Sequence, residues 1–317
     1  LAKRSLPLAY SNDLMAKPFV KWAGGKRQLL DKLTNTLPQN FGTIIPGSYA
    51  EPFVGGGAMM FKLFEMKLIE KAVICDFNEE LILVYNTIKE DVVGLIQELS
   101  TLKKEYDSLE LDARRELYFQ LRDEFNKSKI STDFSNLSPK WAKRASLFIF
   151  LNKTGFNGLY RVNKSGYFNV PPSNMADKDF VQKENLLQVS AVLANVTILH
   201  GDYQKCGEYL EKDWFVYFDP PYRPISATSF TTYSSHKWGD DKEQIRLADF
   251  CKELNEISVN ILVSNSDPKQ VNPSDLFFEE QYLAAQGFQI KSVDARRAIN
   301  SKGDGRGKVK ELLISNY

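Results

Sequence analysis

The chain has 317 residues, of which 43% are hydrophobic and 26% are charged, and its formal net charge is +1. This composition is ordinary for a globular protein of one large or two smaller domains, so any nucleic-acid signal must be local. The three cysteines show neither metal nor disulfide spacing. Without a signal-peptide pattern or an apolar run of about 18 residues, the sequence predicts a cytoplasmic protein with no membrane segment.

The first part of the chain reads as one half of an open α/β sheet. A glycine turn and short helix are expected over 21–33, a strand, glycine loop and helix over 48–64, and a strand and helix over 71–88. The second of these strands ends at an acid, Asp76. The order strand–loop–helix–strand with that acid is typical of a doubly wound, Rossmann-like sheet.

The middle of the chain has a different pattern. Apolar residues at helical spacing predict helices over 92–109, 113–127 and 141–155. Strand patterns then resume at 196–203, 214–221, 259–266 and 311–317. We therefore expect a catalytic domain made of residues 17–90 and 195–317, interrupted by a helical domain at 91–194.

The glycine loop "EPFVGGGA" places Gly55 and Gly57 between a strand and a helix. Glycine allows close backbone approach to a ligand, and the free amides of the helix start face that ligand. A plain tight turn and a dinucleotide loop are the alternatives, but Met60 occupies the third glycine position of the dinucleotide motif. Glu51 at the strand end suits an amino-bearing ligand. Asp76 has the spacing of a ribose-binding acid, or it caps the next helix.

The segment "YFDPPY", residues 217–222, follows a buried apolar run. Pro220 and Pro221 cannot continue a central strand and force a rigid turn. Asp219 and the Pro220 carbonyl can accept hydrogen bonds from one exocyclic amine, and Tyr222 offers a face on which a flat ring stacks. The segment therefore predicts a holder for a planar aminated ring, with a structural turn as the alternative.

Five motifs occur in the order found in one family: "KWAGGK" (21–26), "EPFVGGGA" (51–58), "DFNEELI" (76–82), "NKTGFNGLYRVNKSGYFNVP" (152–171) and "DPPY" (219–222). The chain thereby resembles the Dam-type DNA adenine-N6 methyltransferases of the D12 class. The resemblance implies a Rossmann-like S-adenosylmethionine-dependent methyltransferase sheet with an inserted helical DNA-recognition domain. It also implies S-adenosylmethionine as methyl donor and adenine, usually within GATC of double-stranded DNA, as acceptor.

The resemblance also assigns roles to residues. Asp76 would bind the ribose hydroxyls of the cofactor, and Phe77 would border its adenine. The complete expected cofactor set is Trp22, Lys26, Glu51, Phe53, Gly55, Gly57, Asp76, Phe77 and Asp219. The expected catalytic set is Asp219, Pro220, Pro221 and Tyr222, of which Tyr222 would stack on the extruded base.

A direct mechanism follows from this resemblance. The target adenine must leave the duplex, which costs a few kcal/mol. Its N6 then receives the methyl group without a covalent enzyme intermediate, because no cysteine lies in a nucleophile motif. We expect no metal in this reaction, since alignment and hydrogen bonding supply the catalysis. A monomer is expected, with a companion restriction nuclease as one biological setting.

The DNA-facing segment is expected between residues 135 and 175, which contain no acid. Its basic residues are Lys140, Lys143, Arg144, Lys153, Arg161 and Lys164, and aromatic residues such as Trp141 lie between them. A solvated basic helix face is the alternative to a nucleic-acid surface. Arg161 is the candidate for reading guanine, because its fork matches O6 and N7. By the resemblance, Leu159 and Pro171 would contact a thymine methyl, Phe156 and Asn157 would enter the duplex, and Lys21 would add a base contact.

Two further segments are expected to bind phosphates. One is the basic stretch 291–310, predicted as a flexible loop before the last strand, and the other is the Ser/Thr-rich stretch 226–238. Three alternatives to GATC methylation stay open. They are the same chemistry on RNA or a protein amide, a DNA-binding module without activity, and a longer site such as GATATC.

Overall fold

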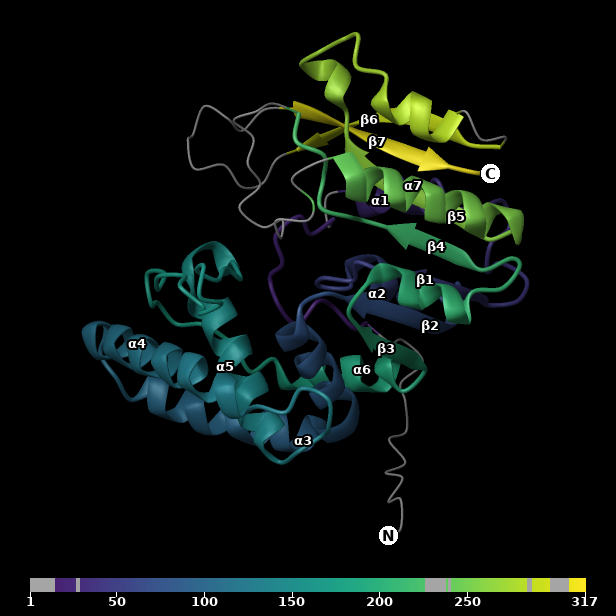
Figure 1. Ribbon diagram of the computed structural model, residues 1–317. Coiled ribbons are helices and arrows are strands. Elements are labelled where there is room, and N and C mark those ends of the chain that lie inside the picture. The colour runs from purple at the N-terminus through teal and green to yellow at the C-terminus, as the bar shows by residue number, and fades with distance from the viewer. Residues whose placement is uncertain (1–14, 27–28, 226–237, 239–240, 284–286, 297–307) are drawn as a thin grey trace.

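The computed structural model describes residues 15–26, 29–225, 238, 241–283, 287–296 and 308–317. Its centre is a seven-stranded sheet in the order β3-β2-β1-β4-β5-β7-β6 (Figure 1). The strands are β1 (Gly47–Glu51), β2 (Ile69–Asp76), β3 (Val196–His200), β4 (Phe215–Phe218), β5 (Asn260–Ser266), β6 (Gln289–Arg296) and β7 (Lys308–Ser315). The predicted α/β class with a Rossmann-like sheet is confirmed.

Helices connect and flank these strands. The α-helices are α1 (Leu30–Thr34), α2 (Ala58–Glu65), α3 (Glu79–Asp107), α4 (Leu111–Ser128), α5 (Lys140–Thr154), α6 (Lys183–Leu193) and α7 (Asp241–Glu256). The short helices are η1 (Lys129–Ser131), η2 (Phe156–Gly158), η3 (Tyr203–Tyr209), η5 (Pro268–Gln270) and the π-helical η6 (Glu279–Leu283). Among the helices of the described ranges, none combines the length and apolar character that a membrane span requires.

Strand direction determines which residues lie at the edge where the parallel strands end. Strands β1 to β5 pair in parallel, whereas β7 pairs antiparallel with both β5 and β6. The carboxyl ends of the parallel strands therefore share one edge with the first residues of β7. The chain order reverses between β1 and β4, and ligands of open α/β sheets bind at such a switch point.

The two faces of the sheet are covered by different helices, because successive strand residues point to opposite sides. Tyr49 and Ile74 belong to the core that α1, α2 and α3 cover, whereas their neighbours Ala50 and Val73 belong to a second core. Residues of η3, α7 and η6 cover that second core. The apolar side chains on the two faces of the strands thus hold the sheet between two layers of helices.

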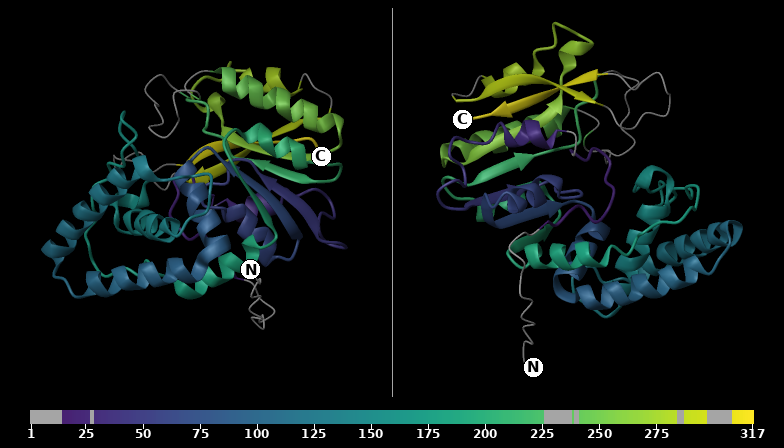
Figure 2. Two further views of the ribbon diagram at one scale, coloured as in Figure 1. Left: turned by 60° about the horizontal axis from the view of Figure 1, so that its bottom comes forward. Right: turned by 180° about the vertical axis from the view of Figure 1, so that it is seen from behind.

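A group of helices lies beside the sheet rather than on it. Helix α3 covers the sheet with its first turns, loses helical geometry at Asp91 (φ −143°, ψ 54°) and continues away from the sheet. Its later part packs against α5, which in turn packs against α4, and the views in Figures 1 and 2 agree with this arrangement. We call the described residues 92–182 the helical block.

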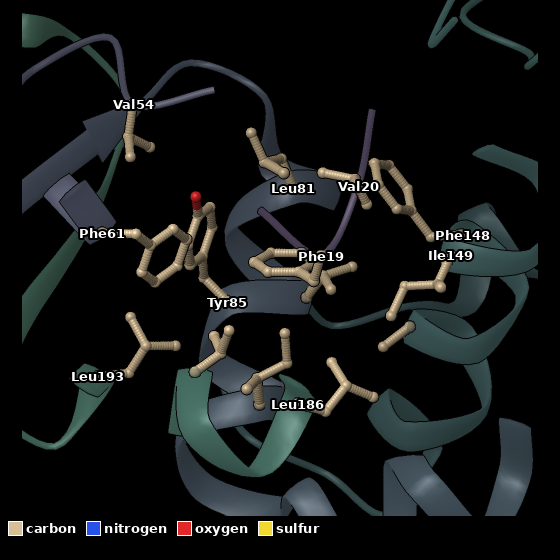
Figure 3. Close-up of a cluster of buried hydrophobic side chains, with 14 of the residues drawn as sticks. Phe19, Val20, Val54, Phe61, Leu81, Tyr85, Phe148, Ile149, Leu186 and Leu193 are labelled. Carbon is tan, nitrogen blue, oxygen red and sulfur yellow. The ribbon is translucent and has the colours of Figure 1, made fainter. Parts of the chain in front are cut away.

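An N-terminal segment joins the sheet to this block. Phe19 and Val20 are buried among side chains of α3 and α5 (Figure 3). The ring of Phe19 meets that of Tyr85 edge-on, with centroids 4.9 Å apart. The same segment continues to Trp22 and Lys26, so core packing fixes where these two side chains stand.

Candidate active site at the carboxyl edge of the sheet

Three acidic side chains stand where neighbouring parallel strands end. Glu51 ends β1, Asp76 ends β2, and Asp219 directly follows β4. The strands β2, β1 and β4 are neighbours in that order, so the three acids lie side by side along one edge. They therefore occupy the switch point at which an α/β sheet binds its ligand.

The turn after β4 holds Asp219 through two partners that are distant in sequence. Its Oδ1 accepts a hydrogen bond from the Ser264 hydroxyl (3.0 Å) and lies 2.9 Å from the Lys26 ammonium. The sequence predicted Lys26 only as a cofactor contact, and it did not predict Ser264. Both contacts fall on Oδ1, which leaves Oδ2 to face another group.

The DPPY turn is fixed by buried amide side chains as well as by its prolines. The Gln244 amide donates to the Pro221 carbonyl (2.9 Å), and Asn265 accepts from the Arg223 amide (3.0 Å). Asn265 also donates to Gln244 (3.0 Å), and both are almost fully buried. Helix α7 and strand β5 thus clamp the turn from two sides, while Pro220 itself is buried.

Tyr222 completes the turn with an oriented ring. Its hydroxyl donates to Glu311 on β7 (2.7 Å), and the Lys26 ammonium lies 4.4 Å from the ring centroid. Burial, with the charges of Asp219 and Glu311 adding to it, raises the pKa of Tyr222 well above its usual value. The phenol therefore stays protonated and remains a hydrogen-bond donor.

The glycine loop needs glycine at both predicted positions. Gly55 and Gly57 have φ of 47° and 68°, in the left-handed region. A Cβ on Gly55 would lie 2.5 Å from the Trp22 ring, and one on Gly57 would lie 2.7 Å from the Tyr85 hydroxyl. The loop is therefore packed too closely for a larger residue at either position.

Asp76 closes this loop onto the end of β2. Its Oδ2 accepts from the Gly55 amide (3.0 Å) and its Oδ1 from the Asn78 amide (2.9 Å). Desolvation raises the pKa of Asp76. The alternative that Asp76 caps the next helix is wrong, since Asn78 caps α3 by accepting from Glu80 and Leu81. The ribose-binding role of Asp76 stays a prediction.

Two aromatic residues of the predicted cofactor set differ in exposure at this edge. Phe77 is 62% exposed directly after Asp76, although it is a large apolar ring. Phe53 instead packs against Tyr203 and Trp238, with ring centroids 5.2 and 5.5 Å away. An exposed ring beside a partly buried carboxylate fits a ligand that carries a planar base and a sugar.

Glu51 is a buried acid whose hydrogen bonds come from neutral donors. The Tyr49 hydroxyl (3.0 Å) and the Met60 amide (3.1 Å) both donate to Oε2. Burial raises the pKa of Glu51 to about 8. A buried carboxyl with this donor set fits an incoming ammonium group, which would restore its ionised form.

We expect Glu51 to make the protein less stable as the pH rises. Its folded-state pKa of about 8 exceeds the ordinary 4.5, so the folded protein holds a proton that the unfolded chain releases. The free energy of unfolding should fall between those pH values, with a slope approaching about 1.4 kcal/mol per pH unit. Urea unfolding of Glu51→Gln should lack this component, and an identical pH dependence in both proteins would contradict it.

Most of the predicted DNA-reading residues lie on a hairpin over residues 155–172. Two isolated β-bridges hold its strands together, Gly155 with Pro172 and Val162 with Phe168. Phe156 is 51% exposed, and Asn157 is exposed with a left-handed φ of 56°. Pro171 is exposed and accepts from the Phe156 amide (2.9 Å). Leu159 packs against the core, and the Arg161 guanidinium donates to the Asn169 side chain (2.8 Å).

Lys21 lies against the same hairpin although it belongs to the N-terminal segment. Asn152 accepts from the Lys21 amide (2.8 Å) and donates to the carbonyls of Lys21 (2.8 Å) and Gly158 (2.9 Å). A Cβ on Gly158 would lie 2.4 Å from the Lys21 side chain. The structure thus brings Lys21 beside the residues with which it was predicted to act.

Trp22 has a second neighbour besides the glycine loop. Its ring stacks on Tyr160 of the hairpin, with centroids 5.9 Å apart and planes 19° apart, and Tyr160 stacks on Phe148. Trp22 therefore connects Gly55 at the sheet edge with the hairpin. Its predicted role beside the cofactor is untested by these contacts.

The basic surface is smaller than predicted. Arg144 is only 4% exposed and forms a two-pronged ion pair with buried Glu80, so the expectation that Arg144 faces DNA is wrong. Trp141 is buried too, with its indole donating to the Asp133 carbonyl (2.7 Å). Helical periodicity explains both, because these two positions lie on the buried side of α5 while Lys143 lies on its exposed side.

The two segments predicted to bind phosphates are only partly described. Most of the Ser/Thr-rich stretch (226–237) and residues 297–307 of the basic stretch lie outside the described residues. Trp238 is buried against Phe53. Residues 291–296 belong to β6, so the prediction of a loop there is wrong.

Comparison with known proteins identifies the family. The model of the family described as D12 class N6 adenine-specific DNA methyltransferase matches residues 22–299. The chain therefore belongs to this family and is a site-specific adenine-N6 DNA methyltransferase. Members of this family use S-adenosylmethionine, and DNA is the substrate that their names imply.

Relatives match over almost their whole length. The chain is 45% identical over 303 residues to the type II methyltransferase M.MjaIII of Methanocaldococcus jannaschii, covering 95% of this chain and 99% of that protein. It is 34% identical to the type II methyltransferase M1.LlaDCHI of Lactococcus lactis, with 98% and 99% covered. It is 33% identical to the DNA adenine methylase of Haemophilus influenzae, with 95% and 93% covered.

Proposed function

We propose that this enzyme methylates adenine N6 within GATC and that the carboxyl-edge site performs the transfer. The observation that carries the assignment of the site is the constellation of Asp219, Lys26 and Tyr222 at the switch point. The hairpin with Arg161 supports a guanine in the recognition sequence, and the relatives named DNA adenine methylases support adenine as the acceptor. S-adenosylmethionine supplies an electrophilic methyl group on a positively charged sulfur.

The cofactor fits the residues beside Asp219. The carboxylate of Asp76 would hold the ribose hydroxyls, and the exposed ring of Phe77 would cover the adenine of the cofactor. Buried Glu51, whose hydrogen bonds come from neutral donors, would meet the ammonium of the methionine part. Gly55 and Gly57 let the loop backbone approach that part closely.

The target adenine would enter beside the DPPY turn. Oδ2 of Asp219 and the carbonyl of Pro220 would accept the N6 hydrogens, while the ring of Tyr222 stacks on the base. The N6 lone pair would form the new N–C bond with the methyl group that the cofactor supplies, whose bond to sulfur would break and leave its electrons on sulfur. N6 becomes positively charged and afterwards releases a proton. Alignment and hydrogen bonding thus supply the catalysis.

The DNA would be read by the helical block. Phe156 and Asn157, exposed at the start of the hairpin, would fill the space from which the adenine leaves. Leu159 and Pro171 would contact a thymine methyl, and Lys21 would add a base contact. This assignment keeps the division into a catalytic domain (17–90 and 195–317) and an inserted recognition domain (91–194), whose first boundary coincides with the break of α3 at Asp91.

Arg161→Ala should relax discrimination at one base pair. Loss of the guanidinium fork removes a contact to guanine worth about 1–3 kcal/mol against the wrong base. The measurement is the ratio of kcat/KM for GATC and for duplexes with the guanine replaced. Exposed Lys164 on the same hairpin provides the control, because Lys164→Ala should weaken binding equally for all sequences. Unchanged discrimination in Arg161→Ala would refute the assigned role.

The recognition sequence on the DNA is tested with a panel of duplexes. Initial rates on GATC, GATATC and single-base variants of each should be highest for GATC, with each substitution costing rate. A preference for GATATC would keep the chemistry and replace the proposed site with the longer one. Equal rates on all duplexes would overturn the assignment of the hairpin as the reading element.

The biological setting is part of the proposal. The type II names of two relatives support a companion restriction nuclease in the same system. The protein is proposed to act on duplex DNA as a monomer. The expected cytoplasmic location stays a prediction.

A further inference from the structure

Glu311 is an acid at the active-site edge that no sequence motif indicated. It lies near the start of β7, and because β7 runs antiparallel to β5, that start lies at the carboxyl edge of the sheet. Its Cα pairs with that of Ser266, two residues beyond Ser264, which bonds Asp219. Its side chain is 16% exposed. The order and direction of the strands therefore place the carboxylate of Glu311 beside the DPPY turn, in addition to that of Asp219.

This carboxylate contacts Tyr222 of the DPPY turn and Lys26, the partner of Asp219. Oε2 of Glu311 accepts from the Tyr222 hydroxyl (2.7 Å) and lies 4.0 Å from the Lys26 ammonium. Lys26 in turn lies 2.9 Å from Asp219 and over the face of Tyr222. The four side chains form one connected network of two carboxylates, one ammonium and one phenol.

The network restricts each member. The hydroxyl bond fixes the rotation of the Tyr222 ring about its own chain, because the ring is tethered at both ends. The attraction of two carboxylates fixes the ammonium of Lys26, which contacts Asp219 only through Oδ1. Oδ2 of Asp219 is thereby kept for the amine. The formal charge of Asp219, Glu311 and Lys26 together is −1, which favours the positive charge that develops on N6.

We propose that Glu311 is a positioning residue for methyl transfer, acting through Tyr222 and Lys26. It holds the stacking ring and the ammonium so that the target amine meets Asp219 in line with the methyl group. This inference rests on the proposed roles of Asp219 and Tyr222. In this role Glu311 would act through its contacts with Tyr222 and Lys26, without touching the adenine or the cofactor.

The test compares Glu311→Ala and Glu311→Gln with the matched control Glu70→Ala. Glu70 is an exposed glutamate on β2 at the opposite edge of the sheet. The readouts are the single-turnover rate of methyl transfer on a GATC duplex, the Kd of S-adenosylmethionine and the Tm. Because a misplaced group costs on the order of 100-fold in rate, Glu311→Ala should lose about that factor with an unchanged cofactor Kd. Glu311→Gln, which keeps an acceptor for Tyr222, should recover part of the loss.

A double-mutant cycle shows whether Glu311 acts through Tyr222. Tyr222→Phe keeps the ring and removes the donor, so the losses of Glu311→Ala and Tyr222→Phe should not add. Losses that multiply fully would overturn the proposed route. If Glu311→Ala melts below the assay temperature, Glu311→Met, which keeps the length of the side chain but offers Tyr222 no oxygen acceptor, replaces it in the cycle, and the same criterion applies.

The outcomes also separate this inference from the proposed function. An inactive Asp219→Ala together with a wild-type rate in Glu311→Ala would overturn the role of Glu311 alone. A wild-type rate in Asp219→Ala would overturn the site and, with it, this inference. A Glu311→Ala protein that loses cofactor affinity and Tm in proportion to its rate would show a structural role and contradict positioning.

Discussion

Asp219→Ala is expected to lose methyl transfer by a factor on the order of 10³, the size of effect seen when a preorganised electrostatic group is removed from a transition state. The variant loses the proposed acceptor for the target amine. It also leaves the Lys26 ammonium and the Ser264 hydroxyl without the oxygen that they contact. Both effects act most strongly when positive charge develops on N6.

The loss should appear in the transfer step rather than in folding. Single-turnover rates, with Tm as the check on structure, separate the two. The matched control is Asp249→Ala, an exposed aspartate on α7 that pairs with Lys252 at the surface and should keep the wild-type rate. An active Asp219→Ala enzyme would contradict the mechanism.

Arg144→Met is expected to destabilise the protein by about 3–5 kcal/mol, because removing one partner of a buried ion pair leaves the other charge uncompensated. Arg144 and Glu80 are 4% and 2% exposed. Arg144 also donates to the Phe125 carbonyl (3.1 Å) and the Ser128 hydroxyl (2.8 Å), and it lies over the Phe125 ring. Burial raises the pKa of Glu80 even with this partner present.

Urea unfolding measures this loss of stability, and a second substitution tests whether the uncompensated charge of Glu80 causes it. Glu80→Gln in the Arg144→Met background should recover a large part of the stability, since the stranded charge is gone. The deficit of Arg144→Met should also shrink at low pH, where Glu80 becomes protonated. Lys143→Met is the control on the same helix, because Lys143 is 46% exposed, 3.8 Å from Glu124, and should cost less than about 1 kcal/mol. Equal losses in the two variants would contradict the importance of the buried pair.

This ion pair matters for the proposed function because its two residues lie beside the two proposed binding elements. Glu80 lies in the first turn of α3, two residues after Asn78, whose amide bonds Asp76. Arg144 lies on α5, which leads directly into the hairpin. The pair, like the stacked rings of Trp22 and Tyr160, therefore joins the proposed cofactor edge to the proposed DNA-reading element.

Local patterns in the sequence predicted much of the sheet and part of the site. The strand at 259–266 and the helix at 141–155 agree with β5 and α5 within one residue, because their apolar periodicity is strong. The spacing between Gly55 and Asp76 predicted that the two act together, and the structure joins them by a hydrogen bond. The patterns missed β6, α6 and α7, and β6 was missed because its mixed polar residues read as a basic loop.

Long-range contacts could not be read from the sequence. Lys26, Asp219 and Glu311 are widely separated along the chain. Lys26 reaches Asp219 from the N-terminal segment, and Glu311 joins them because an antiparallel β7 inserts between β5 and β6. The burial of Arg144 depends on a partner on another helix. A pairing of two charges across elements leaves no periodic signal in either segment.

The most direct test of the central claim is the identity of the methylated product. GATC duplex DNA is incubated with the wild-type protein and methyl-labelled S-adenosylmethionine, digested to nucleosides and separated by chromatography with mass detection, alongside an RNA duplex and Asp219→Ala. We predict label in N6-methyl-2′-deoxyadenosine from the DNA alone, and on the order of 10³-fold less of it in the same time with Asp219→Ala. Label in RNA, in cytosine or in protein, or N6-methyladenine made equally by Asp219→Ala, would contradict the assignment of this site to the target adenine.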